Sequence, residues 1–168
     1  MDYYPNVDAV VWFVKEVLPR LRSKLGRVNF YVVGAKPAKE VLNLTAHIGV
    51  KVIGRVDDVR PHIWQAAISV APIRIARGIQ NKVLEAMAMA KPIVATEQAF
   101  EGIEAVPGRD LLVTKAEPEA YAEAITTLWE QPDLAENMAK NARRVVENRY
   151  DWNVRLEKLH ALLFLKKL

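Results

Sequence analysis

The sequence predicts an α/β protein built on a doubly wound parallel sheet. Short segments rich in β-branched and aromatic residues alternate with segments of helical periodicity along most of the chain. Helices between successive strands imply right-handed crossovers, which place helices on both faces of the sheet. From Pro118 onward every pattern is helical, so we also expect a helical C-terminus.

In the first half of the chain, helix and strand patterns are separated by clear breaks. Asn6 can cap a helix over residues 7–25, which Pro19 should kink or break. Asp57 or Asp58 could cap a short helix that contains the tryptophan at position 64. The other elements expected here are strands at residues 28–33, 50–53 and 68–71, with a helix through residues 41–48 between the first two.

The second half begins with an Ala- and Met-rich helix over residues 83–90. The strand expected at residues 92–96 begins on a proline, which is tolerated at the first position of a strand. The last strand is expected at residues 111–114. Helices are then expected over residues 120–129, 134–150 and 154–168, with breaks at Pro132 and Asp151.

Composition fits one globular domain, residues 1–168, with 51% hydrophobic and 26% charged residues. The absence of cysteine excludes disulfides and cysteine-based metal sites. The apolar runs are shorter than the roughly 20 residues of a membrane helix, and no export signal is visible. We therefore expect a cytoplasmic protein. A net charge of +4 mildly favours an anionic ligand but does not indicate nucleic acid.

The segment over residues 72–88 carries the clearest chemical signal. In an open parallel sheet, ligands bind beyond the carboxyl ends of the strands, and this segment joins a strand end to a helix. Gly78 would let a phosphate approach free backbone amides at the helix start. The helix dipole, together with Arg74, Arg77 and Lys82, would favour negative charge there. The segment predicts an anion site.

Glu85 lies one helical turn after Lys82 and could accept hydrogen bonds from two ribose hydroxyls. A diphosphate beside a ribose would indicate a nucleotide. On spacing alone, a surface ion pair between Lys82 and Glu85 in a solvated loop explains the pattern equally well. The glycine fingerprint of dinucleotide-binding folds and the phosphate loop of nucleotide hydrolases are both missing.

The sequence gives little support for a metal site or for a hydrolase nucleophile. The three histidines are far apart and lack metal-ligand spacing, so no metal is expected. The G-x-S-x-G elbow of the common hydrolases is not found.

The sequence resembles a known protein family over most of its length. Residues 78–96, GIQNKVLEAMAMAKPIVAT, look like the donor-binding signature of the group-1 glycosyltransferases, called family 4, whose GT-B fold has two facing Rossmann-like domains. Five further stretches fit the same family in the same order, and together they span nearly the whole chain. They are DYYPNVDAV, FYVVGAKP, VIGRVDDVRP, EGIEAVPGRDLLV and the YDW element near the end.

The resemblance implies transfer of a sugar from a nucleotide-diphosphate donor with retained anomeric configuration and no essential metal or other cofactor. Glu85 matches the second glutamate of the family's E-x7-E pattern, which binds the ribose, whereas Arg77 stands where the first glutamate would be. Lys82 and Arg77 would then stabilise the leaving diphosphate, with Gly78 beside it. Gly54 would face the base through its backbone. Other catalytic residues are not identified.

The resemblance also implies that residues 1–168 form the donor domain, with the N-terminal acceptor domain and the first strand of this domain absent. That strand would be central, so we expect either that the sheet closes up without it or that another copy of the chain pairs with the open edge. The isolated chain should not catalyse transfer. The acceptor, a sugar or lipid-linked glycan, would bind through the missing domain.

The closest subgroup by resemblance is the bacterial sugar transferases of exopolysaccharide biosynthesis, and the full-length protein could then lie at the inner face of the membrane. Two alternatives are a nucleotide-sugar epimerase of GT-B fold and a non-enzymatic, flavodoxin-like regulatory domain. The regulatory domain fits poorly, because a flavodoxin-like receiver domain needs an acidic cluster at the ends of its strands. This chain has Gly34, Gly54 and Pro72 at those positions.

Overall fold

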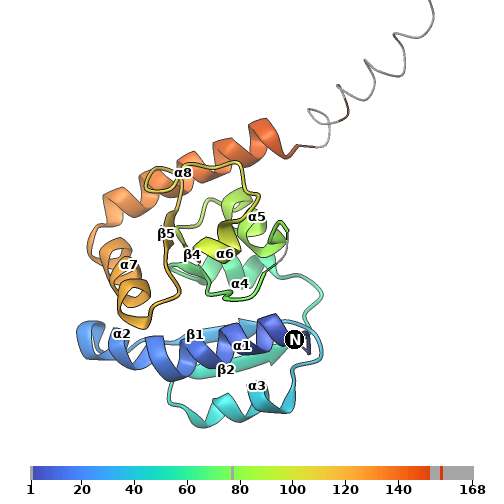
Figure 1. The fold of residues 1–168 in the computed structure, drawn as a ribbon, viewed down its shortest axis with the longest axis vertical. Helices are drawn as coiled ribbons and strands as arrows, with labels where there is room; N and C mark the ends of the chain where they lie inside the picture. Colours follow the sequence, from blue (N-terminus) through green and yellow to red (C-terminus); the bar gives the residue numbers. More distant parts are fainter. Residues whose placement is uncertain (1, 77, 152–155, 157–168) are drawn as a thin grey trace, which may run out of the picture.

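The structure, a computed structural model, describes residues 2–76, 78–151 and 156. It confirms the predicted α/β class, with parallel strands and helices on both sides (Figure 1). The described elements, in order, are α1 (Tyr4–Trp12), the π-helical η1 (Phe13–Val17), α2 (Leu18–Leu25), β1 (Phe30–Val33), α3 (Lys39–Asn43), the 3-10 helix η2 (Leu44–Ala46), β2 (Val50–Gly54), α4 (Arg60–Gln65), β3 (Ser69–Ala71), α5 (Asn81–Ala88), β4 (Ile93–Thr96), α6 (Glu97–Phe100), β5 (Leu112–Thr114), α7 (Pro118–Glu130) and α8 (Pro132–Arg149).

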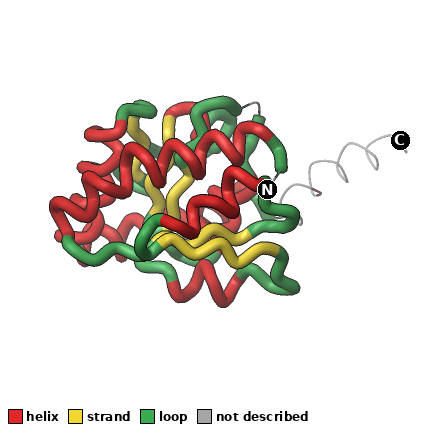
Figure 2. The backbone as a smooth tube through the Cα atoms, turned by 90° about the horizontal axis from the view of Figure 1, so that it is seen from below, coloured by secondary structure: helices red, strands yellow, loops and turns green. Residues whose placement is uncertain are grey.

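The strands form two parallel sheets rather than one. β1 pairs with β2, and β3, β4 and β5 pair in that order. Figures 1 and 2 show that the strands of the two sheets run in different directions. Because β1 and β3 are not hydrogen-bonded to each other, the expectation that the sheet closes up is wrong. Strand pairing between copies of the chain stays a prediction.

One hydrophobic cluster joins the two sheets. Trp12 and Phe13, on the continuous helix α1–η1–α2, pack edge-on against Tyr121 of α7 with ring centroids 5.6 and 6.1 Å away. The cluster contains Val32 of the first sheet and Val94 of the second. Burial of these side chains drives the sheets together, and such aromatic pairs add about 0.5–1.5 kcal/mol each.

Tyr121 also makes a polar contact inside this cluster. Its side chain is fully buried, and its hydroxyl donates a hydrogen bond of 2.7 Å to the carbonyl of Val94 in β4. Burial raises the pKa of Tyr121 well above the usual value of 10.0, because the phenolate would be desolvated. Tyr121 therefore connects α7 to the central strand of the second sheet.

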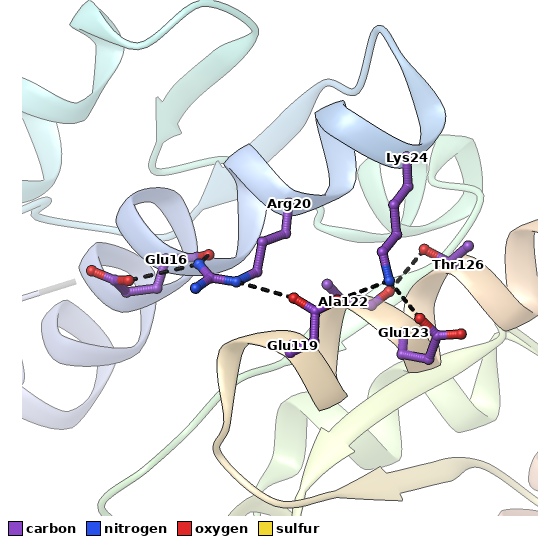
Figure 3. A network of polar contacts seen from close by, with 7 residues as sticks. All are labelled: Glu16, Arg20, Lys24, Glu119, Ala122, Glu123 and Thr126. Atoms are coloured by element: carbon purple, nitrogen blue, oxygen red, sulfur yellow. Dashed lines mark hydrogen bonds and ion pairs between the residues drawn. The ribbon is translucent and has the colours of Figure 1, made fainter.

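The contact between α2 and α7 has a charged rim (Figure 3). Lys24 of α2 lies 3.0 Å from Glu119 and 2.5 Å from Glu123, which are one turn apart on α7. Arg20 lies 3.4 Å from Glu119. Both glutamates are exposed, so these pairs contribute little free energy and mainly fix the register of the two helices.

A second cluster covers the three-stranded sheet. It contains Val83 and Met87 of α5, Ala99 of α6 and Val145 of α8, which pack with the buried residues of β4. Figure 1 shows α8 running across α5 at the end of the molecule away from β1 and β2. This packing fixes α5, and therefore the loop before it, on the second sheet.

Several element boundaries differ from those expected. The first helix begins at Tyr4, so the expected Asn6 cap is wrong; Pro5 occupies the first turn instead, where its missing amide costs nothing. The irregularity expected at Pro19 takes the form of the π-helical turn before it, which relieves the clash of a proline ring with the preceding turn. The short helix α6 was not expected, and the helix expected at residues 154–168 lies outside the described residues apart from position 156.

Helix α5 ends in a Schellman motif that has alanine where glycine is usual. The Lys91 amide donates to the Ala86 carbonyl and the Ala90 amide to the Met87 carbonyl, at 3.0 and 2.9 Å. Ala90 therefore adopts φ 50°, in the left-handed region. A side chain in this conformation costs roughly 1–2 kcal/mol. The turn is followed directly by β4, so the motif fixes the α5–β4 connection.

We expect Tyr121→Phe to lower the free energy of unfolding by about 1 kcal/mol at neutral pH, because the Val94 carbonyl loses its buried donor. The raised folded-state pKa of Tyr121 means that its contribution is complete below the unfolded value near 10 and is lost as pH rises above it. Urea unfolding at several pH values should therefore show a smaller alkaline loss in the variant than in the wild type. Equal alkaline losses would contradict this assignment.

We expect Ala90→Gly to stabilise the protein by about 0.5–1 kcal/mol, because glycine adopts positive φ without strain and only part of that gain is lost to chain entropy. Ala88→Gly, at the exposed end of α5 with helical backbone, is the matched control and should destabilise by up to about 1 kcal/mol. Thermal unfolding of both variants measures the difference, and destabilisation by Ala90→Gly would contradict the prediction.

Candidate functional site

The candidate site is the loop of residues 72–80 and the first turn of α5, beyond the carboxyl end of β3. Buried Ile73 anchors the start of the loop, while Gly78 near its end is exposed and has φ +74°. Apart from its chain neighbours, no atom of the described residues lies within 4 Å of the position that a Cβ would take on Gly78, so backbone conformation rather than space favours glycine there. The N-cap residue Gln80 makes no side-chain capping bond to α5. The helix start is thus open to a ligand.

Lys82, in the first turn of α5, is held by the N-terminal helix. Its ammonium nitrogen donates a hydrogen bond of 2.6 Å to the Oδ1 atom of Asn6 in α1. The residue keeps exposed surface, but neighbouring protein atoms desolvate the ammonium and lower its pKa, an effect that the charge of Glu85 opposes. The partner of this lysine is therefore a neutral amide.

Arg74 contacts the same helix through a carboxylate. Its Nε and Nη2 atoms lie 3.0 and 2.5 Å from the two oxygens of Asp8, a bidentate ion pair. Hydrogen bonding to Asp8 raises the pKa of Arg74. The guanidinium also lies 5.5 Å from the ring centroid of Trp12, at a distance suited to a cation–π interaction. Arg74 thus has its charge compensated inside the protein.

Glu85 and Gly54, two other predicted site residues, lie on different elements. Glu85 is exposed on α5, one turn after Lys82. Arg77 lies outside the described residues. Gly54 ends β2 in the first sheet with φ +80°, and its carbonyl accepts a 2.9 Å hydrogen bond from the Gly34 amide. The structure therefore brings Arg74 and Lys82 together against α1, and no hydrogen bond between described residues links Gly54 to them.

Thr96, the last residue of β4, contacts the start of the loop from the protein interior. It is fully buried, and its hydroxyl donates to the carbonyl of Ile73 while accepting a 3.1 Å bond from the Ala99 amide, which caps α6. One side chain therefore ties the start of the loop to the end of the neighbouring strand. Thr96 therefore positions the loop from the protein interior, and its buried side chain does not face a ligand.

One hollow reaches the loop of the candidate site through Arg74, and a second lies away from it. One of about 440 Å³ has Asp8, Arg74 and Trp12 in its wall and opens between α1 and the start of α7. Another of about 520 Å³ lies beyond the opposite ends of β3 and β4, next to Trp129 and Pro132. The candidate site is thus an exposed surface.

The described ranges contain no cluster of three or more acidic or histidine side chains that could hold a metal ion. Within the same ranges, no helix combines the length and apolarity needed to cross a bilayer.

Asn6 and Asp8 were the residues that the sequence reasoning missed. The local pattern predicts a helix cap at Asn6 and no role for Asp8, although both lie in the DYYPNVDAV stretch that fits the family. Their partners are 76 and 66 residues away, respectively. No local spacing pattern reports contacts over such distances.

Comparison with known proteins identifies the family. The family model described as "Glycosyl transferases group 1" matches residues 1–131, which is most of the chain. No match was found among curated protein sequences.

Solved structures show the same fold at low identity. Sucrose-phosphate synthase from Thermosynechococcus elongatus superposes with a TM-score of 0.75 at 18% identity over 95% of this chain and 43% of its own. HepE from Anabaena in complex with UDP gives 0.71 at 18% identity, over 96% and 44%. The C-terminal domain of the group 1 protein LpcC from Francisella tularensis gives 0.67 at 17% identity, over 90% and 82%.

The chain spans less than half the length of the first two of these proteins, and most of the third, a C-terminal domain. The chain belongs to the group 1 glycosyltransferases, and its fold is that of one Rossmann-like half of a GT-B enzyme.

Proposed function

We propose that this chain binds the nucleotide part of a nucleotide-diphosphate sugar, as the donor domain of an enzyme that transfers the sugar. The observation that carries the proposal is the ammonium of Lys82. It lies in the first turn of α5 beside an open loop, and within the described ranges it forms no ion pair with a carboxylate. A partly desolvated cation at a helix start favours an anion.

The donor diphosphate would lie over the start of α5. The backbone at Gly78 can approach it closely, and Lys82 supplies positive charge as the leaving group forms. Arg77 keeps the same proposed role from the loop. Exposed Glu85, one turn further along α5, would accept hydrogen bonds from the ribose hydroxyls. Gly54 would contact the base through its backbone.

Arg74 has a different role in this arrangement from the one expected. Its bidentate pair with Asp8 competes with phosphate, because a guanidinium that already binds a carboxylate gains less from a second anion. We therefore place Arg74 beside the donor site as a residue that fixes the loop against α1.

For the whole protein we propose transfer with retained configuration, with no essential metal, to a sugar or lipid-linked glycan held by a second domain. The chain covers less than half of the length of sucrose-phosphate synthase and of HepE, which supports the presence of a second domain. The match to the C-terminal domain of LpcC supports a place for that second domain before this one. Structures of HepE hold UDP, UDP with glucose, and UDP-glucose, which makes UDP the first nucleotide to test.

The family match favours transfer over the two alternatives from the sequence, an epimerase and a regulatory domain. The pathway proposed is bacterial exopolysaccharide biosynthesis, in the cytoplasm or at the inner face of the membrane. With the full-length protein, a glycoside product would support transfer, whereas a new sugar nucleotide would indicate an epimerase.

Calorimetric titration of the chain with UDP, GDP and ADP tests the binding site. We expect one of them to bind saturably, and Glu85→Gln to weaken it about tenfold, because the ribose loses charge-assisted hydrogen bonds worth roughly 1.5 kcal/mol. Glu130→Gln, an exposed change at the end of α7, is the control and should leave affinity unchanged. Equal effects of the two substitutions, or no binding of any nucleotide, would contradict the assignment.

A further inference from the structure

Two residues in the first half of α1 contact the described cations of the candidate site, Lys82 and Arg74, through different chemical groups. The amide oxygen of Asn6 accepts a hydrogen bond from Lys82. Asp8, two residues further on, binds Arg74 with both carboxylate oxygens. Both contacts join residues far apart in sequence, and both fix the same loop-and-helix segment to the same helix. The difference between them is one of charge rather than of shape.

The charge of the partner residue determines how strongly each cation can still attract an anionic ligand. Asp8 cancels the charge of Arg74, and its side chain is largely buried, so solvent screens the pair only in part. The amide of Asn6 carries no net charge, so it orients the Lys82 ammonium without cancelling it. Burial lowers the pKa of Lys82, as expected for a cation that has lost water and gained no full counter-charge.

We propose that Asn6 is a positioning and specificity residue for the donor diphosphate, because its neutral amide holds Lys82 in place and leaves the full charge of Lys82 to the ligand. This inference rests on the proposed function. Asp8 has the complementary role, since it keeps Arg74 bound to α1 and out of the phosphate site.

The inference makes opposite predictions for two substitutions that barely change side-chain size. Asn6→Asp places a carboxylate on Lys82 and should create an internal ion pair that competes with phosphate. Asp8→Asn removes a carboxylate and should release the charge of Arg74 toward the ligand. A purely structural role for these residues would weaken binding in both variants.

The experiment is calorimetric titration of the chain with UDP and with uridine, in low salt and in high salt. We expect Asn6→Asp to weaken UDP binding about tenfold or more, and Asn6→Ala only about two- to threefold, because alanine removes the positioning contact without adding charge. Asp8→Asn should strengthen UDP binding severalfold in low salt. Uridine affinity should change little in any variant, and high salt should reduce the differences.

Two further measurements connect these effects to Lys82 and to the fold. Amine-reactive labelling followed by mass spectrometry should show slower modification of Lys82 in Asn6→Asp, because an adjacent carboxylate raises the pKa of the amine, with Lys91 unchanged as an internal reference. Thermal unfolding should show that the Asn6 variants remain folded.

The outcomes separate the two proposals. If the wild-type chain binds UDP and Asn6→Asp binds it no more weakly than Asn6→Ala does, the role of Asn6 is overturned while the donor site stands. If Asp8→Asn weakens UDP and uridine equally, the proposed difference between the two cations is also wrong. If the wild-type chain binds none of UDP, GDP and ADP, the proposed function fails, and this inference fails with it.

Discussion

Burial of one helix against two separate sheets is the interaction on which the rest of the structure depends. β1 and β3 share no hydrogen bonds, so α1, η1 and α2 hold the sheets together through the cluster around Trp12, Phe13 and Tyr121. Apolar burial has no direction, and it joins the sheets without fixing their register. Directional contacts that supply register include the ion pairs of Arg20 and Lys24 with Glu119 and Glu123, and the pairs from α1 to the candidate site.

The same helix therefore has a structural and a chemical role. Its apolar face closes the core between the sheets, and its polar residues near the N-terminus set the positions of Lys82 and Arg74. Thr96 supports the loop from the opposite side, inside the three-stranded sheet. The loop of residues 72–80 is thus held near its start by the buried Thr96 and by the pair of Arg74 with Asp8, while Gly78 is exposed.

Local patterns in the sequence were sufficient for most of the fold. Runs of β-branched residues located all the described strands, and the periodicity of apolar residues located the longer helices. Features that depend on distant contacts were not predictable in this way. Asn6 was misread because capping is judged from the next few residues, whereas its partner is 76 residues away. The split into two sheets depends on which strands pair, and no single strand sequence records its neighbour.

The separation between α1 and the loop also affects how the site forms. Contacts that span 66 and 76 residues close long loops in the chain, so forming them costs more loop-closure entropy than forming local helices does. A partial opening of the molecule that releases α1 would separate Lys82 from Asn6 and Arg74 from Asp8. Under the proposed function, a donor diphosphate that binds Lys82 as Asn6 positions it would favour the closed form and oppose that opening. The proposed function therefore implies a thermodynamic linkage, in which ligand occupancy and the docking of the N-terminal helix each increase the population of the other.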